Sequence, residues 1–178
     1  MTIEGGEEKA EQIVKLTLPV DNIRDHIQGP SAAPVTLSEY GDYQCPYCGQ
    51  AYPIIKQVQK HLGNKLRFVF RNFPITQIHP HAQHGAEAAE SAAAQNKFWE
   101  MHDYLYEHQQ ALDDKHLEKY ASKLGLELVQ FNHDMSSHAY APHIREDFLS
   151  GVRSGVNGTP TFYVDGIRYN VSWNNVSV

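Results

Sequence analysis

The most informative segment of this 178-residue chain is Glu39-Tyr40-Gly41-Asp42-Tyr43-Gln44-Cys45-Pro46-Tyr47-Cys48. It holds both cysteines of the sequence, spaced as Cys-x-x-Cys, so no thiol is left for a structural disulfide elsewhere. A secreted disulfide scaffold would use more cysteines and space them widely. The pair is therefore expected to serve redox chemistry or metal binding.

The flanks of this segment predict a strand–helix–strand unit. Residues 34–40 contain β-branched residues in alternation, typical of a strand that ends at Gly41-Asp42. A helical pattern follows from Cys45 to about Leu62, where Gly63-Asn64 ends it, and residues 66–73 form a second strand closed by Pro74. Two strands joined by a crossover helix are expected to lie parallel in one sheet.

The rest of the chain predicts helices and then a hairpin. Helical patterns cover residues 81–95, 98–109, 114–124, 127–136 and 142–150, and Asp113 and Gly125 suit the N-cap and C′ positions of the third. Residues 161–164 and 167–169 flank Asp165-Gly166, which is typical of a type I′ hairpin. The order predicts an α/β protein whose sheet is split by a helical insertion.

The helix start predicts different roles for the two cysteines. Unpaired backbone N–H groups and the positive end of the helix dipole meet Cys45, so the pKa of its thiol is expected to fall. Pro46 is tolerated at the first helical position because its missing N–H has no partner there. Cys48 lies one turn further in and suits the role of the resolving thiol.

Glu39 is the third candidate catalytic residue. It shares strand parity with Val35 and Leu37, which places it on the apolar face, where burial raises the pKa of a carboxyl group. From there it could accept the proton that Cys48 releases. The alternative is that the strand end turns it to solvent.

Gly158-Thr159-Pro160-Thr161 stands at the entry of the predicted hairpin. From the residues alone, a trans proline that starts an edge strand is the default. A cis bond would instead leave the backbone of Thr159 free to pair with an extended peptide beside the cysteines.

Composition excludes several function classes. The formal net charge is -6, and no run of five or more Lys/Arg occurs, unlike in a nucleic-acid-binding protein. No apolar stretch approaches the roughly 20 residues of a membrane span. Residues 1–11 are polar and acidic, without the apolar core of a signal peptide. We therefore expect a cytoplasmic location, or a periplasmic one if the numbering is that of a mature form.

Together, these features resemble the DsbA-like family of the thioredoxin superfamily. The similarity covers about residues 22–170 and is closest to the soluble DsbA-like domains that also occur fused to bacterial sodium/proton antiporters. It rests on residues 39–48 and on the following motifs: Phe70-Arg71-Asn72-Phe73-Pro74, His79-Pro80-His81-Ala82, Phe98-Trp99-Glu100-Met101-His102-Asp103 and Thr159-Pro160.

The resemblance implies a thioredoxin-like fold with an all-helical insertion. Its parts would be an N-terminal extension (1–31), a first thioredoxin-like part (32–75), the insertion (76–150) and a second thioredoxin-like part (151–178). It further implies Cys45 as the nucleophile, Cys48 as the resolving cysteine, Glu39 as the buried acid and Pro160 as a cis-proline facing Cys45. Thr159, Pro160, Pro46 and Tyr47 would bind substrate.

Two features depart from the family pattern. Tyr47 stands where the strongly oxidising members have histidine, so a less oxidising protein is expected and the direction of catalysis stays open. The family normally closes with a helix after the hairpin, whereas residues 170–178 are short, polar and rich in asparagine.

The resulting prediction is a protein-disulfide oxidoreductase that needs no metal or organic cofactor beyond the Cys45–Cys48 pair. Its partners would be protein thiols or disulfides and an unidentified redox partner, with no nucleic acid and no membrane span. One alternative is a glutathione-linked enzyme, because Cys-Pro-Tyr-Cys is also the glutaredoxin motif. Another is a non-catalytic module that binds a partner or a metal, with His79, His81 or His84 completing a zinc site.

Overall fold

The computed structural model describes residues 13–170. Their centre is a five-stranded sheet in the order β1-β3-β2-β4-β5. Its strands are β1 His26–Gln28, β2 Val35–Gly41, β3 Leu66–Asn72, β4 Thr161–Val164 and β5 Ile167–Arg168. β2 and β3 are parallel, and the other neighbouring pairs are antiparallel. The predicted α/β class and the parallel strand pair are confirmed.

The crossover helix α1 spans Pro46–Leu62 and is followed by the 3-10 turn η1, Gly63–Lys65. Cys45 is its N-cap, and Pro46 occupies the first turn, as predicted. The helix ends where Gly63 takes a φ of 50°, a conformation that glycine adopts without a steric penalty. The local sequence thus fixes the end of α1 that carries the cysteines.

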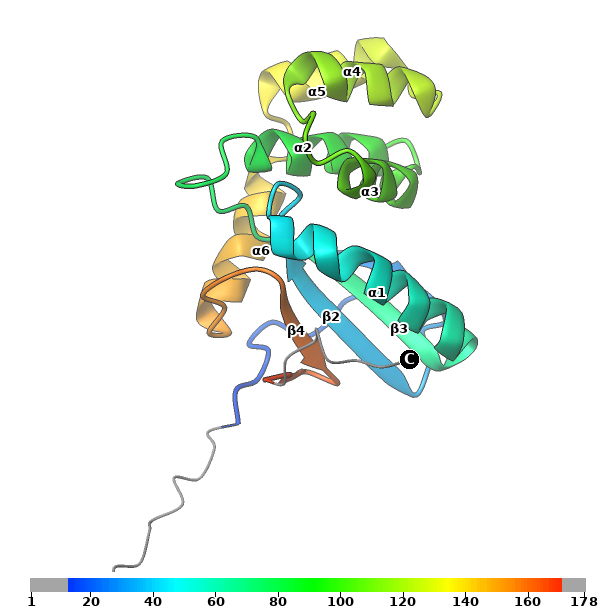
Figure 1. Ribbon diagram of the computed structural model, residues 1–178, viewed down its shortest axis with the longest axis vertical. Coiled ribbons are helices and arrows are strands. Elements are labelled where there is room, and N and C mark those ends of the chain that lie inside the picture. The colour runs from blue at the N-terminus through cyan, green and yellow to red at the C-terminus, as the bar shows by residue number, and fades with distance from the viewer. Residues whose placement is uncertain (1–12, 171–178) are drawn as a thin grey trace, which may run out of the picture.

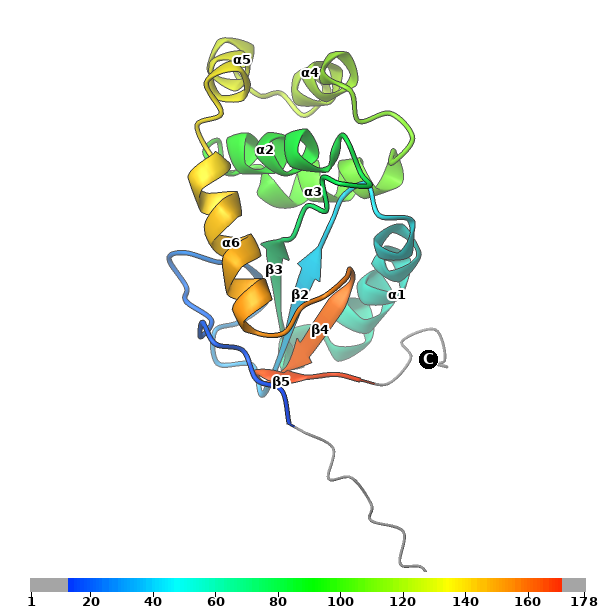
Figure 2. The ribbon, with the colours of Figure 1, turned by 90° about the vertical axis from the view of Figure 1, so that its left-hand side faces the viewer.

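Five helices separate β3 from β4. They are α2 Ala82–Ala93, α3 Phe98–Glu107, α4 Asp114–Lys123, α5 Leu128–Ser137 and α6 Ala141–Arg153. Helices α2 and α3 lie beyond one end of the sheet, and α4 and α5 form a further layer outside them (Figure 1). Helix α6 returns along the sheet on the face opposite α1 (Figure 2). The predicted helical insertion is confirmed.

The predicted caps and turn are also confirmed. Asp113 accepts a hydrogen bond from the backbone N–H of His116 at the start of α4, and Gly125 has a φ of 73° just after its end. Asp165 and Gly166 have φ values of 48° and 78°, the two positive angles of a type I′ turn. These local signals place the second part of the sheet against β2.

Residues near the N-terminus contribute to both edges of the sheet. Residues 26–28, which the sequence analysis assigned to an N-terminal extension, form edge strand β1 on β3, and Lys15 bridges to Ile167 at the opposite edge. The sheet therefore includes residues from before position 31. The unusual C-terminal segment falls almost entirely in 171–178, outside the described residues. No helix within 13–170 is long and apolar enough to cross a membrane.

The two faces of the sheet are covered by different elements. The core that contains Leu37, on the α1 side, is built mainly from α1 and the helical insertion. A smaller core, made of Tyr40, Phe73, Val156 and Tyr163, lies on the α6 side. Because side chains alternate along a strand, β2 sends Leu37 and Glu39 to one face and Tyr40 to the other.

Candidate active site

Cys45 lies at the N-terminus of α1, at the end of the sheet that faces the insertion. Its Sγ is 3.3 Å from the carbonyl oxygen of Thr159, and 4% of the residue is exposed. The Cys48 side chain is the main influence that lowers the pKa of the Cys45 thiol to about 5, with help from Thr159 and the backbone N–H groups of the first turn. The lowered pKa agrees with the prediction from the helix start and favours the thiolate form of Cys45 at neutral pH.

Cys48 has the opposite character. It has no exposed surface, and burial raises the pKa of its thiol well above the usual value. The hydrogen bond to Cys45 and the nearby charge of Glu39 raise it further. The surroundings therefore favour the thiolate at Cys45 and the protonated thiol at Cys48.

Glu39 is buried, as its strand parity predicts. Only 3% of it is exposed, and β2 places it in register with Phe70 of β3 and Phe162 of β4. Burial, with a smaller contribution from the charge of Cys45, raises the pKa of the Glu39 carboxyl to about 8. We find no ion pair or hydrogen bond to this carboxyl from any residue between 13 and 170.

A small cavity borders Glu39. Its volume is about 10 Å³, room for roughly one water molecule, and its lining includes Tyr52, Lys56, His102 and Asp103. Lys56 and Asp103 form an ion pair at 2.6 Å, with side chains 39% and 30% exposed. The same small cavity is therefore lined by the buried Glu39 and by the partly exposed Lys56 and Asp103.

The Thr159–Pro160 peptide is cis, as the resemblance implied. Cys45 Sγ lies beside the Thr159 carbonyl. Pro46 and Tyr47 are exposed on the same helix start, Tyr47 by 60%. The structure therefore brings the four predicted substrate-binding residues to the surface around Cys45.

Two further residues, which were not predicted as site residues, shape this site. Gln109 donates from Nε2 to the backbone carbonyls of Tyr43 and Cys45, both at 2.9 Å. Asp42 accepts from the backbone N–H groups of Gln44 and Ile75, both at 2.8 Å. Gln109 lies 64 residues beyond Cys45, and no local pattern marks it. Both residues hold the turn that orients the cysteine.

Two of the three histidines named in the zinc alternative pair with carboxylates. His79 contacts Asp42 at 2.8 Å, and His84 contacts Asp114 at 2.6 Å. The described residues contain one cluster of potential metal ligands, and neither cysteine belongs to it. The geometry gives no support to a zinc ion shared by the cysteine pair and the 79–84 segment.

The sheet order, the helical insertion, the Cys-x-x-Cys pair at a helix start and the cis-proline beside it define a thioredoxin-fold protein with a thiol–disulfide exchange site. A sequence model of the thioredoxin family matches residues 21–177. The chain belongs to the thioredoxin family, and the predicted resemblance to its DsbA-like branch is confirmed.

Solved structures with this fold include MdbA, a thiol-disulfide oxidoreductase from Actinomyces oris, with a TM-score of 0.70 at 18% identity and with 83% of this chain and 77% of that one covered. Oxidised BdbD from Bacillus subtilis has a TM-score of 0.77 at 22% identity, with 90% of this chain and 91% of that one covered. A thioredoxin-like oxidoreductase from Silicibacter pomeroyi has a TM-score of 0.72 at 27% identity, with 82% and 83% covered. The fold is thus that of known thiol–disulfide oxidoreductases.

Curated relatives show where such a domain occurs. A Na(+)/H(+) antiporter NhaA 1 from Salinispora arenicola is 47% identical over 165 residues, which cover 93% of this chain and 25% of the antiporter. An NhaA from Herminiimonas arsenicoxydans is 40% identical over 168 residues, 94% of this chain and 27% of that protein. The chain spans about a quarter of the length of these relatives, which agrees with the predicted similarity to domains fused to antiporters.

Proposed function

We propose that the protein exchanges disulfides with protein substrates through a mixed disulfide on Cys45. The observation that carries this proposal is the contrast between the two thiols. The pKa of Cys45 is lowered to about 5, whereas burial raises that of Cys48. A nucleophile that is charged at neutral pH, one turn from a protonated resolving thiol, is what exchange requires.

In the reducing direction, the Cys45 thiolate attacks one sulfur of a substrate disulfide. The first S–S bond breaks, a Cys45–substrate disulfide forms, and the other substrate sulfur leaves as a thiolate. Cys48 then loses its proton and attacks Cys45 Sγ, which releases the second substrate sulfur and leaves a Cys45–Cys48 disulfide. The substrate gains two electrons and the protein loses two, and the oxidase reaction is the reverse.

Glu39 is proposed to take the proton from Cys48. While Cys45 is a thiolate, its negative charge helps to keep the Glu39 carboxyl protonated. Formation of the mixed disulfide removes that charge, so the pKa of Glu39 falls and the carboxylate becomes available as a base. The cavity toward Lys56 and Asp103 lets the proton exchange with solvent between turnovers.

Substrate is proposed to dock along Thr159-Pro160. The carbonyl of Thr159 lies within 3.3 Å of the reacting sulfur, so an extended peptide paired with this backbone brings its own sulfur to Cys45. Exposed Pro46 and Tyr47 provide apolar surface beside it. No organic cofactor or metal takes part in this reaction.

A trapping experiment tests the proposal. Cys48→Ser removes the resolving thiol, so mixed disulfides with substrate proteins should accumulate and disappear on addition of a reductant. Cys45→Ser, the matched control, should trap none. A Cys45 that does not react with protein disulfides or with a thiol reagent would overturn the proposal.

Kinetics with two substrates decide between protein and glutathione chemistry. We expect turnover of a protein disulfide. If only a glutathione mixed disulfide is turned over, the protein is a glutathione-linked enzyme and the proposal of protein substrates is wrong. A measured reduction potential would then give the direction of exchange, and cell fractionation would test the predicted cytoplasmic location. The ion exchange of the relatives is not proposed for this chain, which matches only a quarter of each.

A further inference from the structure

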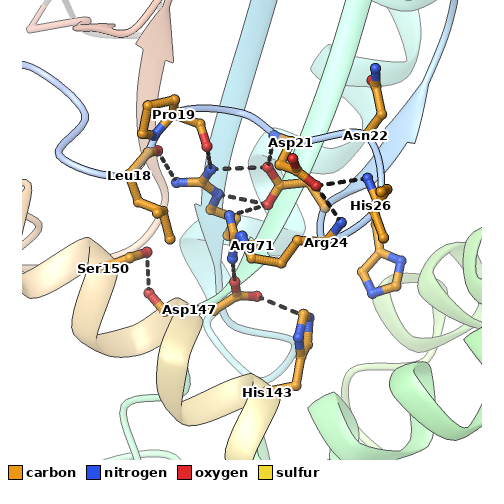
Figure 3. A network of polar contacts seen from close by, with 12 residues as sticks. Leu18, Pro19, Asp21, Asn22, Arg24, His26, Arg71, His143, Asp147 and Ser150 are labelled. Carbon is orange, nitrogen blue, oxygen red and sulfur yellow. Dashed lines mark hydrogen bonds and ion pairs between the residues drawn. The ribbon is translucent and has the colours of Figure 1, made fainter.

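Two histidines and a glutamate meet outside the cysteine site. They are His26 of β1, Glu90 of α2 and His143 of α6, and their ligand atoms all lie within 4.8 Å of one another. His26 Nε2 is 2.9 and 3.0 Å from the two carboxylate oxygens of Glu90, and His143 Nε2 is 3.7 Å from one of them. Figure 3 shows the two imidazole rings in this corner, with Asp147 beside His143.

These distances suit a tetrahedral metal ion. Bonds of about 2.0–2.2 Å from zinc to nitrogen and oxygen place neighbouring ligand atoms about 3.3–3.5 Å apart. The separations from Glu90 to the nitrogens of His26 and His143, 2.9–3.0 and 3.7 Å, bracket that range, and the two histidine nitrogens lie within 4.8 Å of each other. Two imidazole nitrogens and one carboxylate oxygen leave a fourth position for water, a donor set that zinc accepts.

The ligands are held by their surroundings. Asn72 donates to Glu90 Oε1 at 2.7 Å, and the His26 ring stacks on Phe98 with the ring centres 3.5 Å apart. The Glu90 side chain is 5% exposed, while those of His26 and His143 are 18% and 25% exposed. The carboxylate is therefore fixed in the interior, and the histidines leave an entry path from solvent.

The charges in this corner favour a cation. Three carboxylates, those of Asp25, Glu90 and Asp147, lie in this region together with two guanidinium groups, those of Arg24 and Arg71. Figure 3 shows Asp147 with both arginines. Arg71 is committed to Asp25, and Arg24 is shared between Asp25 and Asp147. Glu90 has no arginine or lysine partner among the residues of 13–170, only the two histidines and the Asn72 amide.

We propose that His26, Glu90 and His143 form a binding site for a divalent transition metal, with zinc favoured by the donor set. The three ligands come from an edge strand, the insertion and the helix that returns to the sheet. A bound ion would therefore clamp β1, α2 and α6 together. Its role is structural, because none of these residues touches a cysteine.

The test uses the variant Cys45→Ser/Cys48→Ser, so that thiols cannot bind the metal. Titration with Zn²⁺ against a competing chelator should show one equivalent bound, and Zn²⁺ should raise the unfolding temperature. Co²⁺ should give the visible absorption of a nitrogen–oxygen site without a sulfur charge-transfer band. His143→Gln and His26→Gln in this background should each weaken binding at least tenfold and abolish the thermal shift.

His138→Gln is the matched control. His138 contacts Glu87 of α2 at 2.9 Å, a second histidine–glutamate pair, and the ring centre of His84 lies 6.1 Å from that of His138. Within residues 13–170, only His26, Glu90 and His143 bring three ligand atoms within 4.8 Å of one another. This variant should bind Zn²⁺ like the parent. Failure of the parent to bind Zn²⁺ below millimolar concentration, or equal binding by the His143→Gln and His26→Gln variants, would overturn the proposal. Because the cysteines are absent, neither result bears on disulfide exchange.

Discussion

The neighbouring strands β2 and β3 each bury an ionisable side chain, on opposite faces of the sheet. The two side chains differ in whether they have hydrogen-bond partners. Arg71 of β3 is fully buried, and its five N–H groups reach Asp25, Tyr40 and the backbone carbonyls of Leu18 and Pro19. Figure 3 shows Arg71 beside Leu18 and Pro19. Glu39 of β2 is almost as deeply buried, but within 13–170 it has no ion pair or hydrogen bond.

A buried ionisable group with hydrogen-bond partners and one without them have different roles. A buried charge whose hydrogen bonds are all satisfied fixes its neighbours in place. A buried carboxyl without partners is held near the point where it can gain or lose a proton at neutral pH. The first kind ties residues 18–25 to the sheet, and the second faces the cysteines.

The largest expected effect on stability comes from removing the buried ion pair between Asp25 and Arg71. Asp25→Ala leaves the Arg71 guanidinium buried without its counter-ion, which should lower the free energy of unfolding by about 3–5 kcal/mol. Urea unfolding measures this. The control is Glu100→Ala, which breaks the exposed Lys97–Glu100 pair and should cost no more than about 1 kcal/mol. Equal losses in the two variants would show that Arg71 is not dependent on Asp25.

Removal of the unpaired Glu39 carboxyl should instead raise the free energy of unfolding. At pH 7 a carboxyl whose pKa rises from 4.5 to about 8 on folding costs about 3 kcal/mol, and Glu39→Met removes that cost. The reduced variant should therefore be more stable than the parent but slower in resolving a mixed disulfide. Glu146→Gln, an exposed change, should alter neither property. A destabilised Glu39→Met protein would mean that the carboxyl has a favourable partner.

The two titrating groups should oppose each other in the pH dependence of stability. The pKa of Cys45 falls from 9.0 to about 5 on folding, so its stabilisation is complete above pH 9 and lost as the pH falls through 5. The pKa of Glu39 rises, so its cost is absent below pH 4.5 and complete above about 8. The two slopes largely cancel between pH 5 and 8 in the reduced protein.

Single variants should expose each slope. Relative to the parent, stability of reduced Glu39→Met should rise with pH by up to about 1.4 kcal/mol per unit between pH 5 and 8. Cys45→Ser should instead fall over the same range. Urea unfolding at four pH values measures both, and parallel profiles for the parent and the variants would contradict the assigned pKa directions.

The smallest effect is expected at Tyr47. Its side chain is 60% exposed, and the influences that lower the pKa of Cys45 come from Cys48, Thr159 and the backbone instead. Tyr47→His adds a cationic group that solvent screens, so it should lower the pKa of Cys45 modestly and raise the reduction potential by up to about 30 mV. A fall in potential would show that tyrosine itself stabilises the thiolate.

Much of the fold was predictable because its signals are local. The order of the elements from β2 to β5, the Asp113 cap, the Asp165-Gly166 turn and the burial of Glu39 each follow from residues a few positions apart, whereas edge strand β1 was not predicted. The cis bond at Pro160 was not of this kind. The residues alone favoured a trans proline, and only the family resemblance indicated the cis form that the structure shows.

By itself, the sequence determined that a reactive cysteine pair begins a helix between parallel strands, because capping and periodicity act over a few residues. Tertiary structure decided which polar side chains contact residues that are distant in the sequence. Asp25 reaches Arg71 across 46 positions, and Gln109 reaches Cys45 across 64. His26 and Glu90 are also 64 positions apart in the sequence, and they lie in contact beside His143. Contacts of that range depend on how the insertion and the N-terminal strand pack on the sheet, which no local pattern encodes.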